Sequence, residues 1–227
     1  MARIILLETS TALCSVALAE DGKVTAYRES SAPKAHASLT AVFVQEVLEE
    51  RGIRLADCDA VCVSMGPGSY TGLRVGVSTA KGLCFGARKP LLAVGTLDTL
   101  VAQAAEESAD SFKYIIPMVD ARRMEVYTAV FEDGTQITET APAIIDENSF
   151  AEYLAAGPCL FIGDGAGKCA DVIKHPNARF CQCHPKASAM LAPAVKALQE
   201  KRFEDVAYFE PFYLKEFVAT VSKKKLF

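Results

Sequence analysis

Hydrophobic positions in the first half of the chain come in short apolar runs and in longer stretches with helical spacing. The short runs are rich in β-forming residues and are bounded by turn residues, which is typical of strands. Asp21-Gly22 is a strong signal for a hairpin between two of them. The pattern predicts strands at 3–9, 13–20 and 23–29, a helix at 34–51, a strand at 60–65, a glycine-rich turn at 66–69 followed by a helix, a strand at 90–94 and a helix at 96–107.

The second half of the chain repeats this order of elements. Arg122-Arg123 marks a turn, and Asp133-Gly134 supplies a second hairpin signal. The pattern predicts strands at 113–120, at 124–132 and up to about 145, a helix at 148–156, a strand at 159–162, a short helix up to 174, a strand at 179–182 and a helix at 188–202.

The two halves overlay with an offset of 112 positions at their first strands and hairpins, which falls to 97 between Gly68 and Gly165, as a shorter helix in the second half would require. Gly134 follows Gly22 by 112 positions, and Asp120 follows Glu8 by the same number. Two copies of a β-β-β-α-β-α-β-α unit predict a duplicated α/β fold with a cleft between the copies. We place the first unit at 1–108 and the second at 109–227, with a C-terminal tail able to pack back on the first unit.

The predicted helix at 34–51 is apolar on two sides. One side carries Leu39, Phe43 and Val47. The other carries Ala37, Ala41, Val44 and Leu48. A helix with two apolar sides needs a cover on both. We therefore expect its own sheet on one side and a partner chain on the other.

The helix after the glycine-rich turn has a small residue at every fourth position. These residues are Gly72, Gly76, Ala80 and Cys84. Because a glycine inside a helix costs about 1 kcal/mol relative to alanine, this stripe indicates that another backbone comes close. The turn itself, 66–69, has a second interpretation, since glycine-rich turns that enter helices often hold phosphates. We favour the turn as the start of the helix, and the helix as a face presented to another protein.

The composition, 51% hydrophobic and 23% charged, suits a folded chain with substantial cores. A net charge of −4 argues against a protein that binds nucleic acid alone, although the tail carries Lys223–Lys225. No window approaches 18 uncharged apolar residues, and the first residues resemble a strand more than a signal peptide. With eight cysteines and no export signal, we expect a reduced, cytoplasmic protein without membrane association.

Few residues are arranged for metal binding. His36 has no second histidine one turn later, where Thr40 stands, and two imidazoles are usual at such sites. Cys181, Cys183 and His184 lie close in sequence, but no second ligand pair accompanies them, so we interpret them as structural. The sequence predicts no metal site and no cofactor.

Acidic residues after two strands are candidates for a cleft. Asp120 and Asp164 follow strands of the second unit, and the simplest interpretation is that they hydrogen-bond turn amides. Glu8 follows the first strand, and no glycine in the next residues would let amides reach a phosphate. We expect a vestigial cleft at Glu8, Thr9, Ser10, Asp120, Gly163 and Asp164.

Several stretches together resemble one family. They are ETSTALCSVAL at 8–18, SMGPGSYTGLRVGVSTAKGL at 64–83, DARRMEVY at 120–127, FIGDGA at 161–166 and PFYLK at 211–215. In this order they resemble the bacterial tRNA threonylcarbamoyladenosine biosynthesis family TsaB, also called YeaZ, within the actin/sugar-kinase/Hsp70 superfamily. The resemblance implies a duplicated ribonuclease-H-like or actin-like ATPase fold.

The resemblance also implies a function. TsaB-like proteins are non-catalytic scaffolds that pair with a TsaD-like catalytic subunit and a TsaE-like ATPase. The complex transfers a threonylcarbamoyl group to adenosine 37 of tRNAs that read codons beginning with adenine. Such a chain would meet tRNA only through the complex and would form a homodimer when alone. On this interpretation the partner interface comprises His36, Leu39, Thr40, Phe43, Val47, Thr71, Gly72, Val75, Gly76, Thr79 and Ala80.

An independent enzyme of the same fold is the alternative. The turns at 66–69 and 163–167 suit an ATP-dependent small-molecule kinase or a phosphate-binding hydrolase. Under the scaffold hypothesis, Gly76→Leu should abolish pairing and leave the isolated chain folded.

Overall fold

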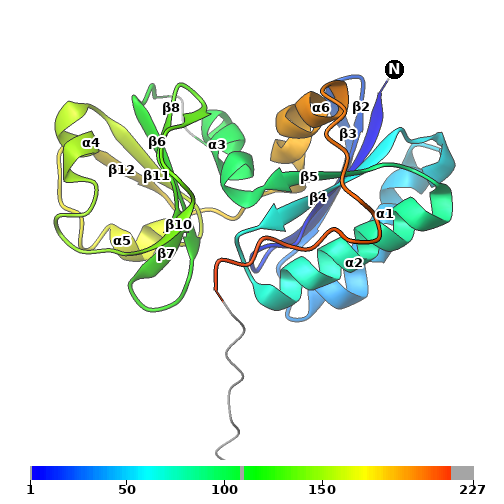
Figure 1. The fold of residues 1–227 in the computed structure, drawn as a ribbon, viewed down its shortest axis with the longest axis horizontal. Coiled ribbons are helices and arrows are strands. Elements are labelled where there is room, and N and C mark those ends of the chain that lie inside the picture. The colour runs from blue at the N-terminus through cyan, green and yellow to red at the C-terminus, as the bar shows by residue number, and fades with distance from the viewer. Residues whose placement is uncertain (1, 108–109, 216–227) are drawn as a thin grey trace, which may run out of the picture.

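The computed structural model describes residues 2–107 and 110–215, which form two α/β bodies side by side (Figure 1). The first body holds a five-stranded sheet in the order β3-β2-β1-β4-β5. Its first three strands form an antiparallel meander, and β4 and β5 continue the sheet parallel to β1. The strands are β1 (Arg3–Glu8), β2 (Cys14–Glu20), β3 (Lys23–Ser30), β4 (Ala60–Gly66) and β5 (Leu91–Gly95).

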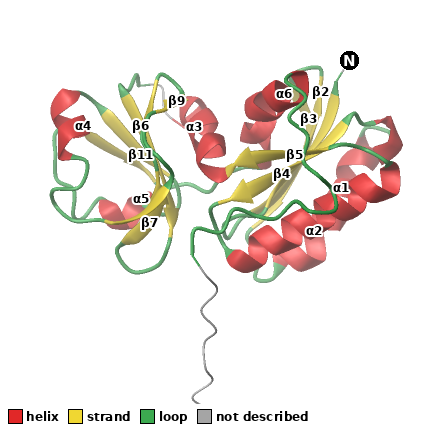
Figure 2. Cartoon of the chain, in the orientation of Figure 1, coloured by secondary structure: helices red, strands yellow, loops and turns green. Residues whose placement is uncertain are grey.

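Helices cover both faces of this sheet (Figure 2), because its central strands are apolar on both faces. On β1, Ile5 and Leu7 pack beneath α1 and α2, whereas Ile4 and Leu6 pack against η2 and α6. Burial of each such side chain contributes about 1.5–3 kcal/mol to the stability of the folded state. The elements are α1 (Ala35–Glu50), the short 3-10 helix η1 (Leu55–Asp57), α2 (Tyr70–Ala87), the 3-10 helix η2 (Ala187–Met190) and α6 (Leu191–Gln199).

The second body repeats the strand order of the first, as β10-β7-β6-β11-β12. β6 pairs antiparallel with β7 and parallel with β11, just as β1 pairs with β2 and β4. Helices α4 and α5 cover one face, and α3 covers the other. The elements are α3 (Thr96–Glu107), β6 (Tyr114–Asp120), β7 (Glu125–Thr128), β8 (Phe131–Glu132), β9 (Thr135–Gln136), β10 (Ala141–Ile144), α4 (Ala151–Ala156), β11 (Cys159–Ile162), α5 (Ala166–Cys169) and β12 (Ala178–Cys181).

Two strands predicted for the second body are interrupted. The strand predicted at 124–132 is divided into β7 and β8, and the strand predicted to end near 145 is divided into β9 and β10. At the first break, the amide of Val130 donates to Thr138 Oγ1 at 2.8 Å. The amide of Val130 is thus bonded to a side chain and not to the backbone of a neighbouring strand. The spacing of apolar residues does not predict such a break in a strand.

Some predicted helices are shorter than expected. Helix α4 begins at Ala151, and α5 ends at Cys169. The helix predicted at 188–202 is divided into η2 and α6, and Pro193 lies in the first turn of α6. The missing N–H of this proline costs little stability, because the N–H groups in the first turn of a helix have no partner within that helix.

The chain exchanges helices between the two bodies. Leu97 and Leu100 of α3, which follow the first sheet in sequence, pack against Ile162 of the second sheet. Met190 and Ala194 of η2 and α6, which follow the second sheet, pack beneath the first. The division at 108/109 remains a prediction, and this exchange means that neither predicted unit would bury its own core without the other.

The segment after α6, residues 200–215, forms a strap over the first body (Figure 1). The amide of Glu204 donates to Leu91 O at 2.9 Å, and the amide of Phe212 donates to Met65 O at 2.8 Å. Between them, Lys81 Nζ on α2 donates to two carbonyl oxygens of the strap, those of residues 207 and 209. Within the described residues, no helix is long and apolar enough to cross a membrane.

Candidate functional site

The glycine-rich turn at 66–69 is closed by the loop between β1 and β2. The amide of Ser69 donates to Ser10 O at 2.6 Å, and the Ser69 hydroxyl caps α2 by accepting from Gly72 N at 3.3 Å. A Cβ on Gly68 would lie only 2.3 Å from Ser10 O. Because the chain's own carbonyl fills the space that a phosphate would need, the turn serves to start α2.

The small-residue stripe of α2 also faces the chain itself. A Cβ on Gly72 would lie 2.1 Å from Thr9 O, and a Cβ on Gly76 would lie 2.2 Å from Thr9 Oγ1. Thr9 Oγ1 donates to Gly72 O at 2.9 Å. The backbone that the stripe admits is therefore the β1–β2 loop, and the prediction that the stripe meets another protein is wrong.

Six of the predicted interface residues are buried within the chain itself. They are Thr40, Phe43, Val47, Gly72, Gly76 and Ala80. The other five keep some exposed surface: His36, Leu39, Thr71, Val75 and Thr79. Any interface on these helices must therefore use their outward sides, and its location stays a proposal.

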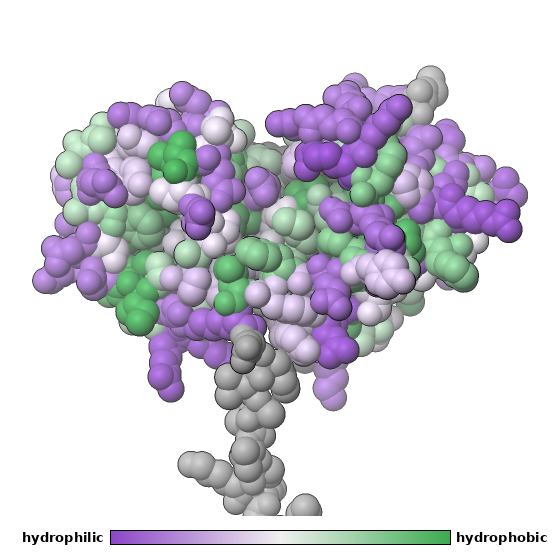
Figure 3. Space-filling model, viewed as in Figure 1, coloured by the Kyte–Doolittle hydropathy of each residue, from purple (hydrophilic) through white to green (hydrophobic). Residues whose placement is uncertain are grey.

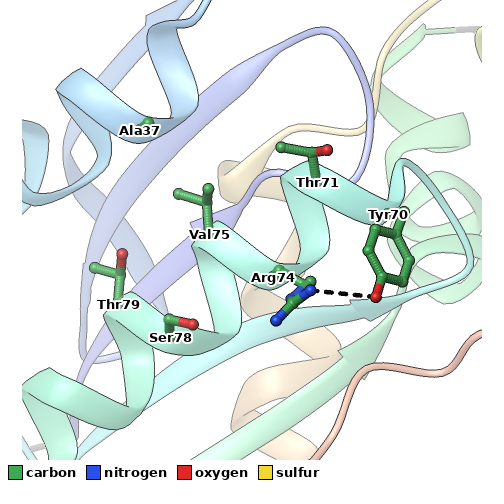
Figure 4. A pocket seen from close by; sticks show the side chains of 7 residues that line it. All are labelled: Ala37, Tyr70, Thr71, Arg74, Val75, Ser78 and Thr79. Carbon is green, nitrogen blue, oxygen red and sulfur yellow. Dashed lines mark hydrogen bonds between the residues drawn. The ribbon is translucent and has the colours of Figure 1, made fainter. Parts of the chain in front are cut away.

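The outward sides of α1 and α2 enclose a shallow pocket of about 450 Å³. Figure 4 shows Thr71, Val75 and Thr79 following one another along α2. Arg74 Nη1 donates to Tyr70 Oη at 3.2 Å, and its guanidinium carbon lies 5.4 Å from the centre of that ring. The lining residues are Ala37, Tyr70, Thr71, Arg74, Val75, Ser78 and Thr79.

Sequence reasoning missed four of these lining residues: Ala37 as a pocket residue, Tyr70, Arg74 and Ser78. The signal was present, because Thr71, Arg74, Val75 and Ser78 recur at helical spacing on the side opposite the glycines. The Tyr70 ring also packs against the ring of Tyr213 in the strap, with the ring centres 4.9 Å apart and the ring planes tilted by 34°. That contact joins residues far apart in the chain and has no local signature.

Glu8 does not line an open cleft. Its side chain is fully buried, as are Thr9 and Ser10, and η2 lies over this end of β1. Ala187 of η2 donates its amide to the hydroxyl of Ser15, the β2 residue opposite Glu8. The three residues are thus covered by the returning chain, which corrects their assignment to a cleft surface.

Burial has a chemical consequence for Glu8. Its Oε1 accepts from Ser10 N at 2.7 Å, while Oε2 and the Ser10 hydroxyl have no partner within the described residues. Desolvation raises the pKa of the Glu8 carboxyl from its ordinary 4.5 to about 7, against the lowering effect of the hydrogen bond from the Ser10 amide. A carboxyl so placed is poorly suited to hold a cation from solvent.

The acids of the second body hold turns, as predicted. Asp164 Oδ1 accepts from the amide of Asp120 at 2.9 Å, and Asp120 Oδ1 accepts from the amide of Arg122 at 2.9 Å. Asp120 also pairs with Lys168. Burial raises the pKa of Asp164. Gly163 is fitted tightly at φ 129°, since a Cβ there would lie 2.3 Å from Met118 O.

His184, which the sequence analysis interpreted as structural, contacts residues of both bodies. His184 Nδ1 lies 3.2 Å from Thr11 Oγ1 of the β1–β2 loop and 3.9 Å from Asp164 Oδ2. On the other side of that loop, His36 Nε2 lies 2.8 Å from Thr11 O. Both histidines therefore hold the same loop from opposite sides.

The cysteines near His184 pack against α3. Cys181 and Cys183 belong to the core between α3 and the second sheet. Burial raises the pKa of both thiols, that of Cys183 to about 12, so neither is a thiolate at neutral pH. Among the described residues, no three His, Cys, Asp or Glu side chains gather as a metal ion would require.

Comparison with known proteins gives consistent results. The family model of TsaD, tRNA N6-adenosine threonylcarbamoyltransferase, matches residues 29–223. The tRNA threonylcarbamoyladenosine biosynthesis protein TsaB of Escherichia coli is 33% identical over 225 residues, which cover 96% of each chain. YeaZ from Pseudomonas aeruginosa superposes with a TM-score of 0.80 and 28% identity, over 94% of this chain and 100% of that one.

A more distant structure shares the fold alone. The activator of the 2-hydroxyisocaproyl-CoA dehydratase from Clostridium difficile superposes with a TM-score of 0.51 and 8% identity, over 88% of this chain and 96% of that one. With the repeated strand order and the likeness to YeaZ, the predicted duplicated α/β fold of the actin-like class is confirmed.

Proposed function

The chain belongs to the TsaB or YeaZ family, and from this membership we propose that it takes part in forming threonylcarbamoyladenosine in tRNA as a subunit without chemistry of its own. In this proposal a TsaD-like partner carries out the transfer, and a TsaE-like ATPase joins the complex. The chain meets tRNA within that complex, and it forms a homodimer through the same surface when alone.

The observation that carries the proposal is the outward surface of α1 and α2. Around the pocket, Ala37, Thr71 and Ser78 are small, uncharged and exposed. Phe85, farther along α2, exposes 82% of its surface. Small side chains let a facing helix approach closely, and an exposed aromatic suits burial at a protein interface. We propose that helices of the TsaD-like partner lie on this surface.

The geometry of the remaining candidate groups supports a subunit without chemistry. Glu8 is buried beneath η2, and the Ser69 amide of the turn at 66–69 donates to Ser10 O of the chain itself. Asp120 is occupied by Lys168 and by a turn amide. For the alternative, a kinase or hydrolase, titration with Mg-ATP is the discriminating measurement. Micromolar binding with turnover of a small substrate by the purified chain would refute the proposal.

The interface is tested by a change on the outward side of α2. Gly76→Leu is unsuitable, since its side chain would collide with Thr9. Ser78→Arg places a large cation in the middle of the exposed surface, and Ala192→Arg, at an exposed position of α6, is its matched control. We expect only Ser78→Arg to prevent co-elution with the TsaD-like partner, at unchanged thermal stability. Co-elution of the Ser78→Arg chain at the wild-type level would exclude this interface.

A further inference from the structure

The turn between β6 and β7 has arginines at two consecutive positions with positive φ, where glycine, asparagine and aspartate are the usual residues. Three turns in the described chain have positive φ at two consecutive residues. Two of them are Asp-Gly pairs, Asp21-Gly22 (φ 51° and 75°) and Asp133-Gly134 (φ 49° and 73°). The third is Arg122-Arg123 (φ 71° and 51°). Asn-Gly and Asp-Gly are the favoured pairs for this conformation, and side chains with a branched or long stem adopt it at a cost.

The two arginines are exposed, and neither guanidinium makes an ion pair within the described residues. The acids beside them are already engaged, because Asp120 pairs with Lys168 and Glu125 pairs with Lys215. Four cationic side chains therefore stand against two carboxylates at this turn. Asp164 lies behind Asp120, mostly buried, and accepts its amide. The turn carries an excess of positive charge on a chain whose net charge is −4.

The position of the turn suits contact with a large anionic ligand. Figure 1 places β7 and α5 at one edge of the second body, beside the point where the described chain ends. Figure 3 shows hydrophilic side chains gathered along that edge. Lys215, at the end of the strap, lies against Glu125 and 6.0 Å from the ring of Tyr127. A charged, exposed edge of this kind fits a phosphate backbone better than it fits the buried centre of a protein interface.

We propose that Arg122 and Arg123 bind backbone phosphates of the tRNA substrate, with Lys168 and Lys215 adding charge beside them. The inference rests on the proposed function, which supplies the RNA. Arginine is suited to this contact because its planar guanidinium donates two parallel hydrogen bonds to a phosphate. The turn places both guanidinium groups at its tip. The conformational cost of positive φ at two arginines is then offset by the phosphate contacts that the arginines make in the complex.

The double variant Arg122→Asn/Arg123→Gly tests the proposal without endangering the fold, since Asn-Gly is the favoured pair for this turn. The matched control is Arg88→Asn/Lys201→Asn, which also removes two exposed cations from positions with positive φ (54° and 55°). Each chain is mixed with the TsaD-like partner, co-elution is checked, and the affinity of the complex for tRNA is measured at several salt concentrations.

We expect the turn variant to form the complex and to bind tRNA about tenfold more weakly, with a salt dependence less steep by about one to two phosphate contacts. The control should match the wild type. Unchanged affinity and salt slope in the turn variant would overturn the inference and leave the proposed function standing. Loss of co-elution in that variant alone would make the turn a protein contact instead. Absence of a complex with the wild-type chain would refute the proposed function and the inference together.

Discussion

Replacement of Glu8 by glutamine tests whether a carboxyl is sealed between the sheet and η2. The side chain is fully buried, with one oxygen bound to Ser10 N and the other unpartnered among the described groups. Its pKa is raised from 4.5 to about 7 by desolvation. The folded protein therefore holds a proton on Glu8 at pH values where the unfolded chain has lost it.

The sign of the pH dependence follows from this difference. Below pH 4.5 both states are protonated, so the full stability is present. Between pH 4.5 and 7 the folded state binds more protons than the unfolded state, so stability falls as the pH rises. Above pH 7 the loss is complete. At 1.36 kcal/mol per pKa unit, a rise from 4.5 to about 7 corresponds to a loss of roughly 3 kcal/mol.

Glutamine is close in shape to the protonated carboxyl and cannot ionise. We expect Glu8→Gln to match the wild type below pH 4.5 and to exceed its free energy of unfolding by up to roughly 3 kcal/mol at pH 8. Urea unfolding curves at half-unit pH steps measure the difference, and other titrating groups cancel between the two proteins. Glu139→Gln, at an exposed position, is the control. A stability difference that stays constant from pH 5 to pH 8 would refute the reasoning.

Two further predictions concern contacts of α2. Gly76→Ala should lower the free energy of unfolding by about 1–3 kcal/mol, because its Cβ meets Thr9 Oγ1 at 2.2 Å, whereas Gly82→Ala, with nothing within 4 Å, should raise it by up to about 1 kcal/mol. The denaturant midpoints of the two variants measure this difference in stability, and equal effects at the two glycines would contradict the packing of Gly76 against Thr9. Lys81→Met should release the carbonyls of residues 207 and 209, so amide hydrogen exchange in 205–209 should speed up about tenfold while that of Glu204, bound to Leu91 O, stays unchanged.

Local sequence determined the elements and their repetition. Each Asp-Gly pair adopts the positive φ values of a tight turn because residues there act on their own backbone. The short apolar runs form strands that are buried on both faces of a sheet, and this is why such runs predicted strands. The motifs from residue 8 to residue 215 also carried the family resemblance, since each is a contiguous stretch of chain.

Tertiary structure decided what each surface meets. A stripe of small residues on α2 predicts a close backbone, but sequence does not say whose. It belongs to the loop at Thr9, 63 residues before Gly72. The burial of Glu8 likewise depends on η2, which arrives from the far end of the chain. Such contacts are set by the return of the chain over the first sheet, and periodicity within one helix or strand contains no information about that return.

The direction of the α2 stripe then determined the rest of the site. Once the glycines are turned inward, the outward surface of α2 is the one formed by Thr71, Arg74 and Ser78. The same sequence therefore specified a helix with two different sides. Only packing against the β1–β2 loop chose which of the two sides is free to meet another molecule.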